Sequence, residues 1–185
     1  MSDAKRQLRT TMRRGRAGVT DRAQRSRRLA DHVLARLDRE TAGRSPLVVL
    51  AFVGVGGEPD TTPLIEGLAA LGHEVVLPRI DQGEIVAVRW TPTGEMVAGA
   101  FGIPAPHGPA VAPKTVDVVV VPGLAFTVDG RRLGQGGGFY DRFLPLVRRD
   151  CVTIGVGFAE QIVDDLPTEP HDRILDAVVT DAVPE

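Results

Sequence analysis

The chain has 185 residues, and its 22 Lys and Arg residues nearly balance its 24 Asp and Glu residues. This length suits one domain with a core that needs no disulfides, and no apolar run approaches the ~20 residues that a membrane-spanning helix requires. The N-terminus lacks an apolar signal segment, and the single cysteine, Cys151, opens the apolar run CVTIGVGF, which favours a buried residue over a reactive thiol. We therefore expect a cytoplasmic protein with no membrane partner.

Two basic helices are predicted at the start of the chain, over residues 3–14 and 21–40, the second beginning with a capping box of Asp21 and Gln24. The first 28 residues hold ten basic residues against two acidic ones, a net charge of +8, whereas the remainder holds 12 against 22, a net charge of −10. Such an arm can bind nucleic acid. The chain shows no alternation of aromatic and basic residues for stacking bases. We therefore favour solvated charges on packed helices, for Arg13, Arg14, Arg25 and Arg28 in particular, and keep nucleic-acid binding as an alternative.

The rest of the chain alternates strands and helices. Strands are predicted at 47–53, 75–78, 85–90, 116–121, 152–157 and 177–180, helices at 61–71 and 140–149, and mostly loop over 91–113. Such alternation is typical of an α/β fold with a mostly parallel sheet and ligands at the carboxyl ends of its strands. We expect a single-domain three-layer sandwich over residues 1–185, with the N-terminal helices packed on the sheet.

The most distinctive segment is VVVVPGLAFTVDGRRLGQGGGFYDRFL, which begins at Val118. It reads as a buried strand, a loop with paired arginines and clustered glycines, and the start of a helix, an order that presents backbone N–H groups to an anion. A mobile glycine-rich surface loop is the alternative. The segment lacks the Gly-Lys-Ser/Thr ending of the common phosphate-binding loop, and Phe139 stands where a dinucleotide fingerprint has its third glycine. We therefore expect a nucleotide phosphate site of another kind.

Five motifs in order along the chain resemble those of the 5-formyltetrahydrofolate cyclo-ligase (5,10-methenyltetrahydrofolate synthetase) family. They are Lys5 with Arg9, Glu58-Pro59-Asp60-Thr61, the segment Phe101 to Pro104, the segment Arg132 to Arg142, and His171-Asp172. The chain departs from the family at Phe139, where a tyrosine is usual, and at Gln135 and Gly137, where other members can carry a basic residue. Phe139 keeps a flat ring but has no hydroxyl to contribute.

The resemblance implies a set of site residues. ATP would be bound by Lys5, Arg6, Arg9, Arg132, Leu133, Gly134, Gln135, Gly136, Gly137, Gly138, Phe139 and Tyr140. The folate would be bound by Val53, Glu58, Trp90 and Phe139, and Mg²⁺ by Asp141 and Asp172, with Arg132 and Asp141 as the catalytic residues. Each of these residues also has a structural interpretation. Without the resemblance, Lys5 and Arg9 would be interpreted as solvated charges on a helix, and Glu58 and Asp141 as carboxylates that favour the start of a helix. For Asp172, a structural role in a loop is as plausible as metal binding.

The resemblance also implies a reaction, the ATP- and Mg²⁺-dependent closure of 5-formyltetrahydrofolate to 5,10-methenyltetrahydrofolate, with release of ADP and phosphate through an N5-iminium phosphate. Phosphoryl transfer of this kind mainly demands positioning and charge neutralisation. We expect small-molecule partners only and a monomer. A divergent nucleotide-binding member that acts on another substrate remains the first alternative.

Overall fold

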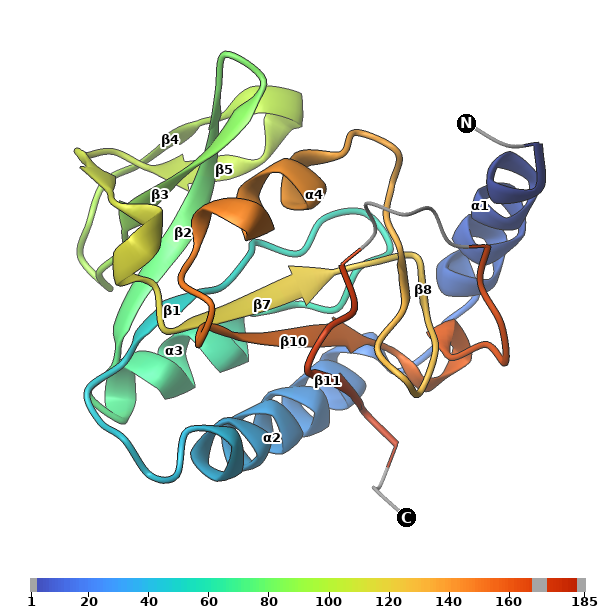
Figure 1. Ribbon diagram of the computed structural model, residues 1–185, viewed down its shortest axis with the longest axis horizontal. Coiled ribbons are helices and arrows are strands. Elements are labelled where there is room, and N and C mark those ends of the chain that lie inside the picture. Colours follow the sequence, from blue (N-terminus) through green and yellow to red (C-terminus); the bar gives the residue numbers. More distant parts are fainter. Residues whose placement is uncertain (1–2, 168–172, 183–185) are drawn as a thin grey trace.

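A seven-stranded sheet forms the centre of the structure (Figure 1), a computed structural model that describes residues 3–167 and 173–182. Its strands lie in the order β11-β10-β7-β1-β2-β3-β6. They are β1 (Val48–Leu50), β2 (Glu74–Asp81), β3 (Glu84–Arg89), β6 (Ala110–Val111), β7 (Val118–Pro122), β10 (Val152–Gly157) and β11 (Ala177–Thr180). The strands from β11 to β2 run parallel, whereas β3 is antiparallel to β2 and β6 to β3. The predicted mostly parallel α/β sheet is confirmed.

Alternate strand residues fill two hydrophobic cores, one on each face of the sheet. In β7, Val118 and Val120 belong to one core and Val119 and Val121 to the other, because successive side chains of a strand point to opposite faces. All four valines are fully buried. Cys151 joins the second core, and burial raises the pKa of its thiol to about 11. It is the buried residue that the sequence predicts.

Helices cover both faces of the sheet, as Figure 1 shows. On one face lie α2 (Arg22–Glu40) and α3 (Thr62–Ala70), with Leu29, Val33 and Leu37 of α2 packed into the first core. On the other face lie α4 (Phe139–Phe143) and a short 3₁₀ turn over Leu144–Leu146. The three-layer sandwich is therefore confirmed. No helix within residues 3–167 and 173–182 is long and apolar enough to cross a bilayer.

The first helix, α1 (Asp3–Ala17), does not pack on a face of the sheet as expected. Its Met12 packs instead with Leu124, Leu133 and Leu166, and Leu124 follows directly on the carboxyl end of β7. Figure 1 shows α1 at the end of the sheet toward which the β7 arrow points. The helix therefore closes the edge where parallel α/β proteins bind ligands.

Local structure departs from the prediction at four further places. The helix at 140–149 is much shorter, since Pro145 cannot donate a helical hydrogen bond and a 3₁₀ turn follows α4. Asp21 has left-handed backbone angles (φ 51°) and makes no side-chain cap, so the capping box was wrong. The loop expected over 91–113 contains β6 and a small antiparallel pair, β4 (Met96–Ala98) and β5 (Pro104–Pro106). A second small pair, β8 (Ala125–Phe126) and β9 (Arg132–Leu133), leads into the glycine-rich segment.

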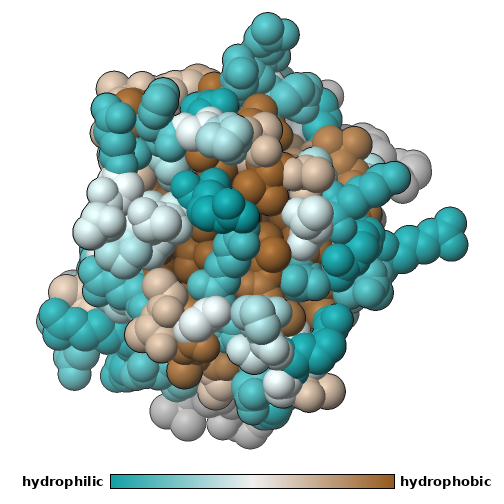
Figure 2. Space-filling view, turned by 90° about the vertical axis from the view of Figure 1, so that its left-hand side faces the viewer, coloured by the Kyte–Doolittle hydropathy of each residue, from teal (hydrophilic) through white to brown (hydrophobic). Residues whose placement is uncertain are grey.

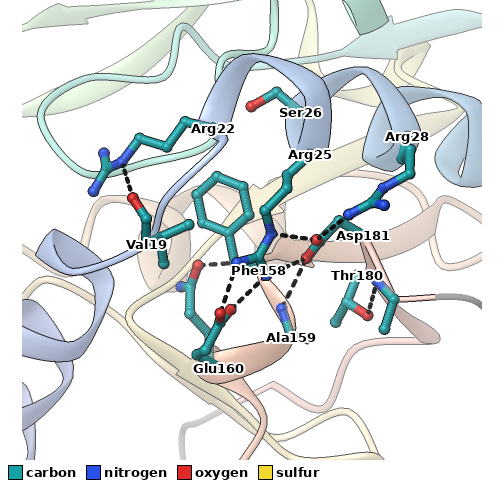
Figure 3. A network of polar contacts seen from close by, with 12 residues as sticks. Val19, Arg22, Arg25, Ser26, Arg28, Phe158, Ala159, Glu160, Thr180 and Asp181 are labelled. Atoms are coloured by element: carbon teal, nitrogen blue, oxygen red, sulfur yellow. Dashed lines mark hydrogen bonds and ion pairs between the residues drawn. The ribbon is translucent and has the colours of Figure 1, made fainter.

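Arg25 is a structural arginine and not a solvated charge, which corrects the prediction (Figure 3). Its guanidinium lies 2.5 Å from Asp181, 2.6 Å from Glu160 and 5.1 Å from the centre of the Phe158 ring. Arg28 lies 3.4 Å from the same Asp181. Burial alone would raise the pKa of Asp181, but hydrogen bonds from Arg25 and from a backbone N–H hold it below its usual value. The network ties α2 to the segments that follow β10 and β11.

Replacing Arg25 by Met should lower the free energy of unfolding by about 3 kcal/mol, because it leaves the buried Asp181 carboxylate without its main partner. A carboxyl group whose pKa is lowered in the folded state stabilises the fold above its unfolded pKa and loses that contribution as the pH falls. The difference between the two proteins should therefore be constant from about pH 6 to 8 and shrink below about pH 4. Denaturant unfolding across this range measures it. Arg27→Met, at an exposed position of α2, is the control, and an equal loss there would contradict the assignment.

Candidate active site

A pocket of about 670 Å³ opens at the carboxyl ends of β1 and β7, beneath α1. Its wall brings together residues from segments far apart in the sequence. Of the predicted site residues, it contains Lys5, Arg9, Val53, Glu58, Arg132, Leu133, Gly134, Gln135, Gly136, Gly137, Gly138, Phe139, Tyr140 and Asp141. The sequence predicted a ligand site at the carboxyl ends of the strands. The pocket lies at that edge, where the carboxyl ends of the parallel strands meet.

The basic side of the pocket comes from one face of α1. Lys5 and Arg9 lie four residues apart and therefore share this face. The Lys5 side chain is buried, and the Arg9 Nε donates a hydrogen bond of 2.9 Å to the carbonyl of Gly134. Arg6 is exposed, lies 3.5 Å from Asp3 and does not line the pocket. The structure thus brings Lys5 and Arg9, but not Arg6, to the predicted phosphate site.

The glycine-rich segment curves around this basic side. Gly136 and Gly138 have φ angles of 107° and 67°, values that other residues adopt only with strain. Arg13 of α1 donates from Nη2 to the carbonyl of Gln135 at 3.0 Å. Arg13 is therefore a contact of the loop and not only a solvated charge, which corrects the prediction. Because α4 has only five residues, an anion here depends on loop amides and basic side chains more than on a helix dipole.

The paired arginines of the loop diverge. Arg132 points into the pocket, where it forms an ion pair with Asp141 and lies 5.9 Å from the centre of the Tyr140 ring. Arg131 lies 3.1 Å from Asp129 and 2.5 Å from an Asp165 carboxylate, and does not line the pocket. Arg131 directly precedes the short strand β9, and Arg132 is its first residue. Successive side chains of an extended chain point to opposite sides. The site therefore contains one arginine of the pair and not both.

Asp141 and Asp172 are the predicted magnesium ligands. The Asp141 side chain is one-third exposed at the pocket wall, whereas Asp172 and the adjacent His171 lie outside the described residues. Residues 3–167 and 173–182 contain no group of three or more His, Cys, Asp or Glu side chains that could hold a metal. Mg²⁺ prefers one or two carboxylates together with water and substrate phosphates. A single carboxylate beside the glycine-rich segment fits that preference.

Glu58 is held by three donors in the turn between β1 and α3. Its Oε1 lies 3.5 Å from Arg16 Nη1 and 3.3 Å from Gln135 Nε2, and its Oε2 accepts a 3.2 Å hydrogen bond from the Val55 N–H. The turn is tight, since a Cβ on Gly54 would lie 1.9 Å from the Pro59 carbonyl oxygen. Glu58 thus links the turn, α1 and the glycine-rich segment.

Sequence reasoning missed Arg16, although a signal for it exists. Arg16 follows Arg9 by seven residues and Lys5 by eleven, spacings that return to the same helix face. It is 7% exposed, which is unusual for an arginine.

The other side of the pocket is apolar. Val53 lies here as predicted, together with further residues that the prediction did not assign to the site, among them Pro78, Ile80, Ile85 and Ile103. Phe101 is 76% exposed at the rim and meets the Phe139 ring edge-to-face at 5.9 Å. The Phe-Gly-Ile-Pro segment was recognised as a motif without a role, and its phenylalanine lies at the pocket.

Trp90 does not belong to this pocket, which corrects its assignment to the folate. Because β3 runs antiparallel to β2, its carboxyl end lies at the opposite edge of the sheet, where the Trp90 N–H donates to the carbonyl of Val75. Trp90 lines a separate cavity of about 640 Å³. Figure 2 views the molecule from the side of β3 and β4, where hydrophobic side chains show between hydrophilic ones.

Tyr140 lines the pocket, but its hydroxyl oxygen is inaccessible to solvent and has no hydrogen-bond partner among the described residues. Burial, reinforced by the charge of Glu58, raises the pKa of Tyr140 above its usual value, so the hydroxyl stays protonated. A ligand could reach this oxygen only if the pocket wall rearranged.

Fold and pocket together define an α/β protein whose site joins a basic side to an apolar wall. Comparison with known proteins gives the family. The sequence model of the 5-formyltetrahydrofolate cyclo-ligase family matches residues 1–181. The chain therefore belongs to that family, as its motifs indicate, and is an enzyme of it.

Individual relatives agree with this assignment. The chain is 38% identical over 140 residues to the 5-formyltetrahydrofolate cyclo-ligase of Mycolicibacterium smegmatis, a match that covers 71% of this chain and 72% of that protein. It is 36% identical over 176 residues to that of Escherichia coli K12, covering 85% and 94%. The NMR structure of Aquifex aeolicus 5,10-methenyltetrahydrofolate synthetase superposes with a TM-score of 0.80 at 34% identity, over 96% of this chain and 89% of the other.

Proposed function

We propose that this chain closes 5-formyltetrahydrofolate to 5,10-methenyltetrahydrofolate, using ATP and Mg²⁺ and releasing ADP and phosphate. The observation that carries the proposal is the single pocket that joins Lys5, Arg9, Arg132 and the glycine-rich loop to Glu58 and an apolar wall. The basic residues and the glycine-rich loop suit the phosphates of a nucleoside triphosphate. The Glu58 carboxylate and the apolar wall suit a ring with several hydrogen-bond donors.

The proposed chemistry begins at the formyl group. Its oxygen is a poor leaving group, so N10 of the folate cannot expel it directly. The formyl oxygen first attacks the γ-phosphorus of ATP, the bond to ADP breaks, and an N5-iminium phosphate forms. The N10 lone pair then attacks the formyl carbon, the carbon–oxygen bond breaks to release phosphate, and N10 loses its proton to solvent. Both steps depend mainly on alignment and on neutralisation of phosphate charge.

The residues divide between these tasks. Lys5, Arg9 and Arg132 would bind phosphate oxygens together with the loop amides, Lys5 as a compact charge and the arginines as planar forks. Glu58 would accept hydrogen bonds from the pterin ring, against the flat ring of Phe139. The helix α1 would limit the access of water to the site.

Asp141 would hold Mg²⁺ together with phosphate oxygens, and Asp172 remains a proposed second ligand. A bound magnesium ion would neutralise phosphate charge during the transfer. The Asp141 carboxylate also pairs with Arg132.

The proposal is tested by incubating the purified protein with 5-formyltetrahydrofolate, ATP and Mg²⁺ and following absorbance near 360 nm, where the methenyl product is expected to absorb. Product and ADP should form in equal amounts. ATP hydrolysis without methenyl product would instead support a divergent member acting on another substrate.

Replacing Asp141 by Asn should raise the Mg²⁺ concentration for half-maximal activity by about tenfold or more, because a neutral amide is a weaker magnesium ligand than a carboxylate. The folate KM should change by less than about twofold. Titration of Mn²⁺ in the presence of ATP measures metal binding independently of turnover. Asp150→Asn, at an exposed position beyond α4, is the control. Unchanged metal dependence in the Asp141 variant would remove this residue from the proposed metal site.

A further inference from the structure

Arg16 is a buried cation whose side chain meets a buried anion at the edge of the pocket. The Arg16 and Glu58 side chains are 8% and 10% exposed, and Nη1 lies 3.5 Å from Oε1. Arg16 does not line the pocket itself, whereas Glu58 does. Arg16 can therefore act on a ligand only through the residues it holds in place, and Glu58 is the pocket residue that it contacts directly.

The turn and the neighbouring helix fix Arg16 in place. A Cβ on Gly57 would lie 3.2 Å from the Arg16 Nε, so the guanidinium packs directly on the turn that carries Glu58. Arg22 of α2 donates from Nη2 to the Arg16 carbonyl at 2.5 Å and from Nη1 to the Gly56 carbonyl at 3.3 Å. The ion pair is thus held between two helices and the turn.

The pair is not explained by stability alone. Burial lowers the pKa of the Arg16 guanidinium, and Glu58 offsets part of that shift. A buried ion pair often contributes no more stability than apolar residues of similar volume, but it fixes the geometry of its members. The remaining contacts of Glu58, with Gln135 and the Val55 N–H, are neutral donors. Arg16 alone among these three contacts neutralises the charge of Glu58.

We propose that Arg16 is a positioning residue that holds the Glu58 carboxylate in place at the pocket wall for the pterin ring. The inference rests on the proposed role of Glu58 in folate binding. It assigns to α1 a second task besides the phosphate contacts, so that one helix face serves both substrates through Lys5, Arg9 and Arg16.

The test compares Arg16→Met with the wild type, and with Arg14→Met at an exposed position of the same helix. In Arg16→Met the folate KM should rise by about tenfold, since a charged hydrogen bond is lost at Glu58, while the ATP KM changes by less than about twofold. Arg16→Lys should restore part of this effect, and Arg14→Met should not show it.

Two further variants keep the test decisive. Gly57→Ala should displace the Arg16 guanidinium without changing any charge, and it should therefore also raise the folate KM. If Arg16→Met does not fold, Gly57→Ala and Arg16→Lys replace it in the test. In a Glu58→Gln background, Arg16→Met should change the folate KM by less than about twofold, because the two residues act as one unit.

Two results would overturn the inference. Equal increases of the ATP and folate KM would show that Arg16 only supports α1. An unchanged folate KM in Arg16→Met would show that Glu58 needs no counter-charge. Both results are judged by comparison with a wild-type protein that is active. A wild type that forms no methenyl product would contradict the proposed function itself, which separates the two failures.

Discussion

Replacing Lys5 and Arg9 together by alanine should weaken ATP binding by about 10²- to 10⁴-fold. Each charged hydrogen bond to a phosphate contributes about 1.5–3 kcal/mol, and each 1.4 kcal/mol is tenfold in affinity. Both residues lie on the wall of the pocket, and Arg9 also holds the carbonyl of Gly134. The loss of ATP affinity should therefore exceed the effect of charge alone, because the glycine-rich segment also loses one of its supports. Calorimetric titration with a non-hydrolysable ATP analogue measures it.

The structure determines the control for this experiment. Arg13 contacts Gln135 and Arg25 is part of a buried network, so neither is a neutral comparison. Arg6 and Arg14 are exposed on α1 and do not line the pocket. The Arg6→Ala/Arg14→Ala protein should bind ATP within about threefold of the wild type.

The same proteins decide between the enzyme and the nucleic-acid alternative. Binding of a mixed-sequence oligonucleotide should be weak in all of them at two salt concentrations. Tight binding that falls steeply with salt and is lost in the Arg6/Arg14 variant would contradict the proposed role of this helix. The structure favours the enzyme, since Lys5, Arg16 and Arg25 are directed inward instead of forming an exposed basic surface.

Much of the fold can be predicted from short-range patterns. The four valines of β7 and the spacing of Leu29, Val33 and Leu37 gave the buried central strand and the apolar face of α2. The β2–β3 pairing was missed because it depends on the turn at Gln82 and Gly83, both with positive φ, where the sequence gives no strong hairpin signal. The docking of α1 was missed because Met12 packs against segments distant in sequence.

The site was predictable to the extent that its residues belong to motifs. Lys5, Arg9, Glu58 and the glycine-rich segment meet in one pocket, as the resemblance implied. Trp90 was misplaced because strand direction, and not sequence proximity, decides which edge of the sheet it reaches. Arg16 was missed because its importance comes from a tertiary contact with Glu58.

The second large effect is expected at Arg132, for which the neighbouring Arg131 is a matched control. Both arginines have the same chemistry and adjacent positions, but only Arg132 lines the pocket. A cation placed on a transferring phosphoryl group is worth about 10³-fold or more in kcat. Arg132→Met should therefore lower kcat by about 10³-fold while changing the folate KM little, as expected when an interaction of the transition state is lost.

The Arg131→Met protein should keep kcat within about threefold, since its ion pairs with Asp129 and Asp165 lie at the surface, where such pairs contribute little to stability. Arg132→Lys should recover only part of the activity, because an ammonium group supplies the charge but not the planar fork. Steady-state and single-turnover measurements of the three variants give kcat and the rate of the chemical step. Comparable losses in Arg131→Met and Arg132→Met would mean that the arginine pair supports the loop as a structural unit, and the assignment of Arg132 to the phosphoryl group would be wrong. Because the two side chains diverge from adjacent backbone positions, a difference of two to three orders of magnitude between them would come from the pocket that Arg132 alone reaches, including its ion pair with Asp141.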